Sequence, residues 1–141
     1  MPHVLASAFA QSTAPAAAFF DRWVDHSSWH EWDPDTESVT VNGPVRAGAT
    51  GRFKPRGGPA VPFTVLVCER PREYTDASRL LGARLTFQHL AAPTDAGTAL
   101  EANVTLEGPL SWLWLRVMGK SFSTSVPAAL ERLVGLVESA R

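Results

Sequence analysis

His89 is the residue of this sequence whose type and position are best suited to chemistry inside the protein. It follows Leu85 and Phe87 at every second position, so in a strand the three side chains point to one face. An imidazole on an otherwise apolar face has two interpretations. It is either a core histidine satisfied by one hydrogen bond, or a polar group that orients a ligand or moves a proton in an apolar cavity. The sequence leaves both open, and His89 is its best catalytic candidate.

Three further side chains could assist His89 in proton transfer. Tyr74 and Asp76 share a face of a predicted strand, and Glu101 lies on another. We favour an outward orientation for Tyr74 and Asp76, because charged residues are seldom fully buried. The acids between residues 33 and 37 lie in a turn and are expected to be solvated.

Other site chemistry finds little support. There is no glycine-rich phosphate loop and no serine in a nucleophile-elbow context. His26 and His30 have the spacing of metal ligands on a helix, but a helix break expected at Ser27–Ser28 removes the shared geometry. We therefore expect both histidines to be solvated, with no metal and no cofactor. Cys68, the single cysteine, lies in an apolar run and is expected to be a buried, inert thiol.

Composition restricts the class of protein. The 141 residues are 45% hydrophobic and 19% charged, with a formal net charge of −1, so one domain over residues 1–141 with a sizeable core is expected. The absence of a basic excess argues against nucleic-acid binding. No apolar segment is long enough for membrane insertion. The alanine-rich start has no basic side chain before Arg22 apart from histidine, which argues against a signal peptide and makes the cytoplasm the expected location.

The first elements are a strand and two helices. Residues 4–10 are small and apolar without a helical period, which predicts a strand. Apolar residues then recur at helical spacing from Ala16 to Trp23, which predicts one buried helical face ending near Asp25. Ser12 or Thr13 is the expected cap of this helix. A second short helix through Trp32, capped by Ser27 or Ser28, should end before Pro34.

The rest of the sequence predicts six more strands and a long helix. The strands are expected at Glu37–Val41, Thr50–Lys54, Ala60–Glu69, Glu73–Leu80, Arg84–Ala91 and Thr98–Glu107. The last two should form an antiparallel hairpin whose loop is residues 93–97. A helix from Leu110 to Ala140 follows, with a kink or restart near Ser123–Ser125 because of Pro127. Helices that bracket antiparallel strands indicate an α+β layered fold.

The five tryptophans are clustered. Trp29 and Trp32 lie in the second short helix, and Trp112 and Trp114 open the long one. These large rings either cap the ends of the core or line the mouth of an apolar pocket.

Several short motifs, in this order and spacing, carry a resemblance to a known family. They are residues 13–20 after the first strand, Trp29–Pro34, Asn42–Val45, Gly48–Gly51, Gly97–Thr98, Gly108–Leu110 and Leu130–Leu133. Together they resemble the START-like superfamily, also described as SRPBCC or Bet v 1-like, and in particular its polyketide cyclase/dehydrase branch. The resemblance covers nearly the whole chain.

The resemblance implies a helix-grip fold. In that fold a seven-stranded antiparallel sheet curls around a long C-terminal helix, two short helices follow the first strand, and a cavity holds a hydrophobic ligand. No universal catalytic motif accompanies it. The ligand-binding positions expected here are Trp29, Trp32, Phe87, His89, Ala102, Val104, Met118, Phe122 and Val126.

Three functions follow as hypotheses. The first is binding of a small hydrophobic ligand such as a lipid, an isoprenoid or an aromatic polyketide. The alternative is a polyketide cyclase/dehydratase that acts by general acid–base catalysis on an enolisable carbonyl. The third is a stress-response or co-chaperone partner, which a large exposed apolar patch without a cavity would favour. A homodimer is left open.

Overall fold

A curved antiparallel sheet wraps one long helix in this computed structural model, which describes residues 2–140. The elements in these residues are β1 (His3–Ser12), α1 (Ala16–Val24), η1 (His26–Glu31), β2 (Thr36–Val41), β3 (Thr50–Pro55), β4 (Val61–Glu69), β5 (Glu73–Leu80), β6 (Ala83–Thr94), β7 (Gly97–Glu107) and α2 (Ser111–Ser139). Their order agrees with the predicted order of strand, two helices, six strands and long helix.

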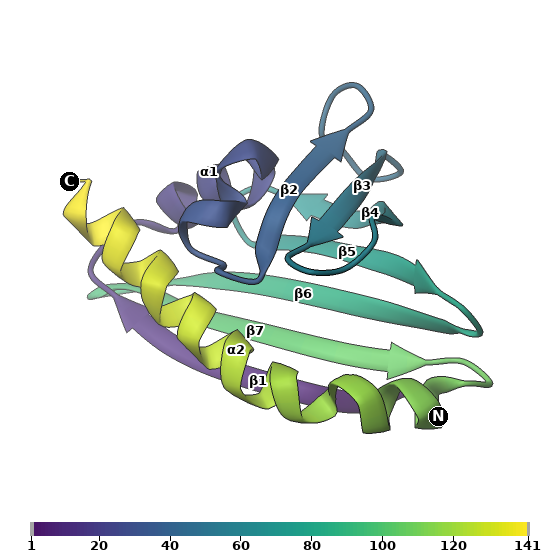
Figure 1. Cartoon of the computed structure of the whole chain (residues 1–141). Coiled ribbons are helices and arrows are strands. Elements are labelled where there is room, and N and C mark those ends of the chain that lie inside the picture. Colours follow the sequence, from purple (N-terminus) through teal and green to yellow (C-terminus); the bar gives the residue numbers. More distant parts are fainter. Residues whose placement is uncertain (1, 141) are drawn as a thin grey trace.

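The sheet runs in the order β1-β7-β6-β5-β4-β3-β2, and every pair is antiparallel. Figure 1 shows α2 crossing the sheet beside β1, while α1 and η1 cover the end at which α2 finishes. β1 and β2 are the two edges, and the sheet does not close into a barrel. This is the predicted α+β helix-grip fold. No helix in residues 2–140 has the length and apolar character needed to cross a membrane.

The two short helices form for the predicted reason, but their caps were predicted wrongly. Ala16, Phe19, Phe20 and Trp23 are buried on one face of α1. The N-cap of α1 is Pro15 rather than Ser12 or Thr13. The second helix is a 3₁₀-helix whose N-cap is Asp25, and the Ser28 hydroxyl donates a hydrogen bond to the Asp25 carbonyl at 2.8 Å.

The predicted hairpin of β6 and β7 is confirmed and is longer than expected. Its register pairs Phe87 with Val104 and His89 with Ala102, so apolar positions of both strands share the inner face. Pairing continues to Thr94 and Gly97. The connecting loop is shorter than predicted because strand geometry continues through Pro93.

The helix α2 is not restarted at Ser123–Ser125, and that part of the prediction is wrong. It runs without interruption from Ser111 to Ser139 with Pro127 inside it, although its axis bends along its length in Figure 1. Pro127 removes a single backbone donor. Buried Ala129 and Leu130 hold the helix against the core just beyond it.

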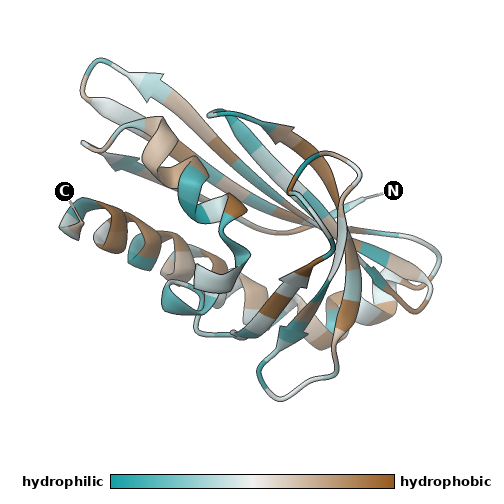
Figure 2. Cartoon of the chain, turned by 90° about the horizontal axis from the view of Figure 1, so that it is seen from above, coloured by the Kyte–Doolittle hydropathy of each residue, from teal (hydrophilic) through white to brown (hydrophobic). Residues whose placement is uncertain are grey.

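The apolar core consists of two clusters. The larger lies under α1 and η1 and includes Trp23, Tyr74, Leu130 and Leu133. The smaller lies near the start of α2 and centres on Leu85, Val104 and Leu106. Figure 2 shows apolar and polar segments alternating along α2, as expected for a helix that turns one face to the sheet. The half-buried Val126 contacts both clusters.

Candidate functional site

A cavity of about 390 Å³ lies between the sheet and α2. Its wall is formed by η1 and its end, by β3 to β7, and by α2. All nine positions predicted from the sequence to bind a ligand lie on this wall: Trp29, Trp32, Phe87, His89, Ala102, Val104, Met118, Phe122 and Val126. The rings of Phe87 on β6 and Phe122 on α2 meet edge to face, with centroids 5.8 Å apart, so sheet and helix are in direct contact beside the cavity.

His89 projects from β6 into this wall. Its Nδ1 lies 3.2 Å from the Tyr74 carbonyl oxygen, which can only accept, so Nδ1 carries the proton. Burial lowers the pKa of His89 to about 4, which the Tyr74 carbonyl partly opposes. The ring is therefore neutral near pH 7, and its Nε2 is a hydrogen-bond acceptor. Trp23 packs beside it at 5.4 Å between ring centroids.

Tyr74 and Asp76 point inward, contrary to the predicted outward orientation. The Tyr74 hydroxyl donates to Asp76 Oδ2 at 3.0 Å, and Asp76 is 3% exposed and lines the cavity. Burial raises the pKa of Asp76 to about 7, while the Tyr74 hydrogen bond opposes that shift. The pairing of β5 with β6 explains this orientation, because Tyr74 pairs directly with His89 and Asp76 with Phe87. Residues directly opposite each other in a ladder share a face.

His26 was expected to be solvated and is instead buried, while His30 is exposed as predicted. His26 Nε2 lies 2.6 Å from the Tyr74 hydroxyl, so His26, Tyr74 and Asp76 form one hydrogen-bonded chain. Burial lowers the pKa of His26 to about 4. The sequence signal that was missed is a repeat of three positions. Aromatic side chains recur at Trp23, His26, Trp29 and Trp32, which is the spacing of one face of a 3₁₀-helix.

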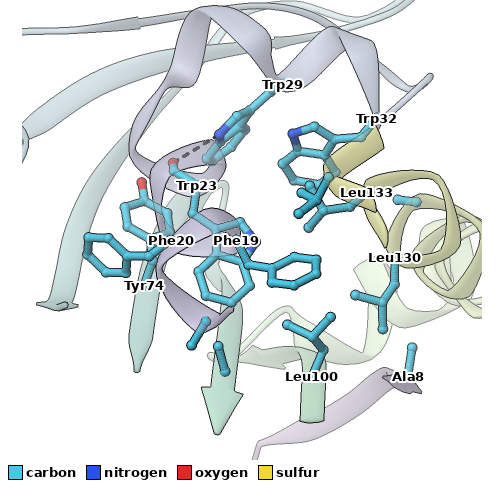
Figure 3. Close-up of a cluster of buried hydrophobic side chains, with 14 of the residues drawn as sticks. Ala8, Phe19, Phe20, Trp23, Trp29, Trp32, Tyr74, Leu100, Leu130 and Leu133 are labelled. Atoms are coloured by element: carbon cyan, nitrogen blue, oxygen red, sulfur yellow. Dashed lines mark hydrogen bonds between the residues drawn. The ribbon is translucent and has the colours of Figure 1, made fainter. Parts of the chain in front are cut away.

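The first tryptophan pair is buried at the cavity and the second is not. Trp29 donates through Nε1 to the Trp23 carbonyl at 3.0 Å, as Figure 3 shows, and Trp32 belongs with Leu133 of α2 to the larger core cluster. Trp112 is 54% exposed, so it neither caps the core nor lines the cavity. Trp114 donates to the Leu81 carbonyl at 2.8 Å and packs on the smaller cluster.

Solved structures of other proteins share this fold. No family model and no curated protein matches the sequence. Among solved structures, Ara h 8.0201 is 16% identical over 99% of both chains with a TM-score of 0.68. The Zhui aromatase/cyclase from a Streptomyces species is 14% identical, with 98% of this chain and 94% of that chain covered and a TM-score of 0.73. The chain has the START-like helix-grip fold.

The di-domain aromatase/cyclase StfQ of the steffimycin biosynthetic pathway is also similar in structure. It is 14% identical with a TM-score of 0.75, and the match covers 95% of this chain and 50% of StfQ. The side chains that line the cavity, rather than the fold alone, decide what it can bind.

Around the opening of the START-like cavity, Asp33, Asp35 and Arg56 line the wall. Asp33 is partly buried rather than fully solvated as predicted, and its carboxylate accepts from Thr36 Oγ1 at 3.0 Å and from the Asp35 amide at 3.1 Å. Burial raises the pKa of Asp33. Arg56 donates through Nε to the Pro34 carbonyl at 3.0 Å.

Glu101 does not belong to this site. It accepts from Asn103 Nδ2 at 2.8 Å on the other face of β7, away from Ala102 and Val104, so it cannot assist His89. Cys68 was expected to be buried but is half-buried against the larger cluster, and burial raises the pKa of its thiol. Among residues 2–140, no group of three or more histidine, cysteine, aspartate or glutamate side chains is arranged to hold a metal ion.

Proposed function

We propose that the protein binds a small hydrophobic molecule in the cavity between the sheet and α2. The observation that carries this proposal is a cavity of about 390 Å³ whose exposed wall is predominantly apolar and includes polar side chains such as Asp76 and His89. Ligand pockets combine apolar area with a few convergent polar groups in this way. The rings of Trp29, Trp32, Phe87 and Phe122 on the wall favour a ligand with an aromatic or polyene part.

Filling the cavity should weaken ligand binding strongly. Ala102 lies on the wall directly opposite His89 in the ladder, so in Ala102→Phe the added ring grows into empty space. With N-phenylnaphthylamine as a neutral fluorescent probe, we expect affinity to fall by about tenfold or more, since the probe and the new ring compete for one volume.

The matched control is Glu101→Phe, which adds the same ring to the other face of β7. It should bind the probe as the parent does. Circular dichroism verifies that both variants fold, and Val104→Phe provides a second obstruction should Ala102→Phe unfold. Unchanged probe affinity in a folded Ala102→Phe protein would rule out this cavity as the binding site.

A second candidate function is general acid–base catalysis on an enolisable carbonyl, and the position of Asp76 favours it. Two titratable side chains, Asp76 and His89, face one cavity. Because the pKa of Asp76 is about 7, both of its protonation states are populated near neutral pH, which suits proton transfer. His89, with a pKa of about 4, is better suited to orient the substrate as an acceptor. In this reaction the Asp76 carboxylate takes a proton from the carbon beside the carbonyl, the C–H electron pair forms the enolate, and the proton is then returned.

This second function predicts isotope exchange. In heavy water, the parent should accelerate deuterium incorporation beside the carbonyl of phenylbutanone, followed by proton NMR. Asp76→Asn should reduce that rate by about a hundredfold, the usual contribution of one acid–base group. His89→Gln, which retains an acceptor, should retain much more of the rate. Exchange that is equally fast in Asp76→Asn would exclude Asp76 as the base.

A further inference from the structure

We propose that the ligand of this cavity carries a basic nitrogen, and that its ammonium group pairs with the carboxylate of Asp76. This inference rests on the proposed ligand-binding function and adds the chemical class of the ligand. It excludes fatty acids and other carboxylates as the preferred occupants.

Asp76 is a buried carboxyl group with no cationic side chain paired to it among residues 2–140. Its carboxylate lines the cavity and accepts a hydrogen bond from Tyr74, a neutral donor. The salt bridges found among residues 2–140 join surface side chains, and none includes Asp76. A buried carboxylate without a cation is unfavourable. A ligand that brought a cation would offset that cost.

No side chain around Asp76 supplies the positive charge. His26 of η1 reaches it only through Tyr74, and His89 of β6 is held neutral by burial. Cys68 of β4 lies opposite Tyr74 and is a neutral thiol. In the described part of the chain, β7 and α2 place no titratable side chain on the cavity wall.

The charged side chains that line the cavity are mostly acidic. Asp33, Asp35 and Asp76 contribute three carboxyl groups to the wall, and Arg56 contributes one guanidinium group. Arg56 lies at the opening, where it donates to the Pro34 carbonyl, and is exposed to solvent. A cleft lined mainly by one sign of charge concentrates ligands of the opposite sign.

The aromatic walls near the polar end strengthen the preference for a cation. Phe87 lies directly opposite Asp76 in the ladder between β5 and β6, and Trp29, Trp32 and Phe63 complete this end of the cavity. Ring faces attract an ammonium group, and the attraction grows when water is excluded. A carboxylate at the same place would face both Asp76 and the negative faces of the rings.

The test compares three ligands with the same phenyl ring and butyl chain: phenylbutylamine, phenylbutanol and phenylbutyrate. Isothermal titration calorimetry of the full chain near pH 7.5 should give the order amine, alcohol, acid, with the amine bound about tenfold more tightly than the alcohol, the lower end expected for a close buried charge pair. Tighter binding of the acid than of the amine would overturn the inference while leaving hydrophobic binding intact. Failure of all three to bind would overturn the proposed function, and this inference with it.

Two variants test whether Asp76 causes the preference for the amine over the alcohol. Asp76→Asn should bring the amine to the affinity of the alcohol while leaving the alcohol unchanged, because only the charge is lost. Glu101→Gln makes the same chemical change on the other face of β7, outside the cavity, and should leave the preference unchanged. An amine preference that survives Asp76→Asn would assign the cation to another group.

A measurement on the parent alone covers the case in which Asp76→Asn does not fold. Because part of the Asp76 population is protonated at pH 6.5, pairing with an ammonium group should release a fraction of a proton. The binding enthalpy of phenylbutylamine should therefore depend on the ionisation enthalpy of the buffer, and that of phenylbutanol should not. Buffer-independent enthalpies for both ligands would overturn the proposed pairing.

Discussion

Replacing Trp23 by alanine is expected to lower the free energy of unfolding by about 3 to 5 kcal/mol, the range for deleting a large buried aromatic side chain. Trp23 is 1% exposed and lies in the larger core cluster beneath α1. Its ring also packs against His89 at 5.4 Å, so its loss removes support from the polar end of the cavity. Urea unfolding followed by far-ultraviolet circular dichroism measures the change.

Trp112→Ala is the matched control, because it deletes the same side chain at a position that is 54% exposed. It should change stability by less than about 0.5 kcal/mol. Trp23→Phe should cost less than Trp23→Ala, since it retains a ring and removes an indole N–H that is buried without a partner among the described residues. Equal losses in Trp23→Ala and Trp112→Ala would contradict the assignment of Trp23 to the core.

The second large effect is the dependence of stability on pH between about 4 and 6.5. In this range the unfolded chain protonates His26 and His89, whose ordinary pKa is 6.5, while the folded chain does not. Their contribution to stability is therefore present above pH 6.5 and is lost as the pH falls toward 4. Asp76 acts in the opposite direction, because its pKa rises from 3.8 to about 7 on folding. Its contribution is present below pH 3.8 and is lost as the pH rises through 7.

Asp33, whose pKa burial also raises, acts in the same direction as Asp76. The shifts of the two histidines and of Asp76 taken alone leave the unfolded chain with about one more bound proton than the folded chain in this range. Stability should then increase with pH by on the order of 1 kcal/mol per pH unit. Asp76→Asn removes one opposing group and should make that slope about twice as steep. His89→Gln removes one histidine and should bring the slope close to zero. Urea unfolding at a series of pH values measures all three.

Slopes that remained the same in the parent and in Asp76→Asn would show that Asp76 titrates alike in the folded and unfolded chains. That result would contradict its burial.

The helices and strands follow from local patterns and were therefore predictable. Alternation along β6 and β7 placed Phe87, His89, Ala102 and Val104 on one face, because a strand has only two faces. The stripe on α1 likewise identified Trp23 as buried. Wall positions on α2 came instead from the family resemblance. Caps and helix continuity depended on finer local geometry, and the sequence patterns misplaced the caps of α1 and η1.

The hydrogen-bonded group of His26, Tyr74 and Asp76 was not predictable from such local patterns. Hydrogen bonds to partners distant in sequence offset the cost of burying Asp76 and His26. His26 and Tyr74, for example, are separated by 48 positions. A rule based on residue type places a charge on the surface. Only the pairing of β5 with β6 makes the inward orientation of Tyr74 and Asp76 evident.

The division of the core into two clusters with a cavity between them has a consequence for the turnover of the protein. A molecule that occupies the cavity makes contacts that the empty chain lacks, so it stabilises only the folded form. At a hundredfold excess over its dissociation constant, such a molecule adds about 3 kcal/mol to the free energy of unfolding. Proteases that attack transiently unfolded chains would then remove empty molecules faster than loaded ones. The abundance of the protein in a cell is thus expected to follow the supply of its ligand.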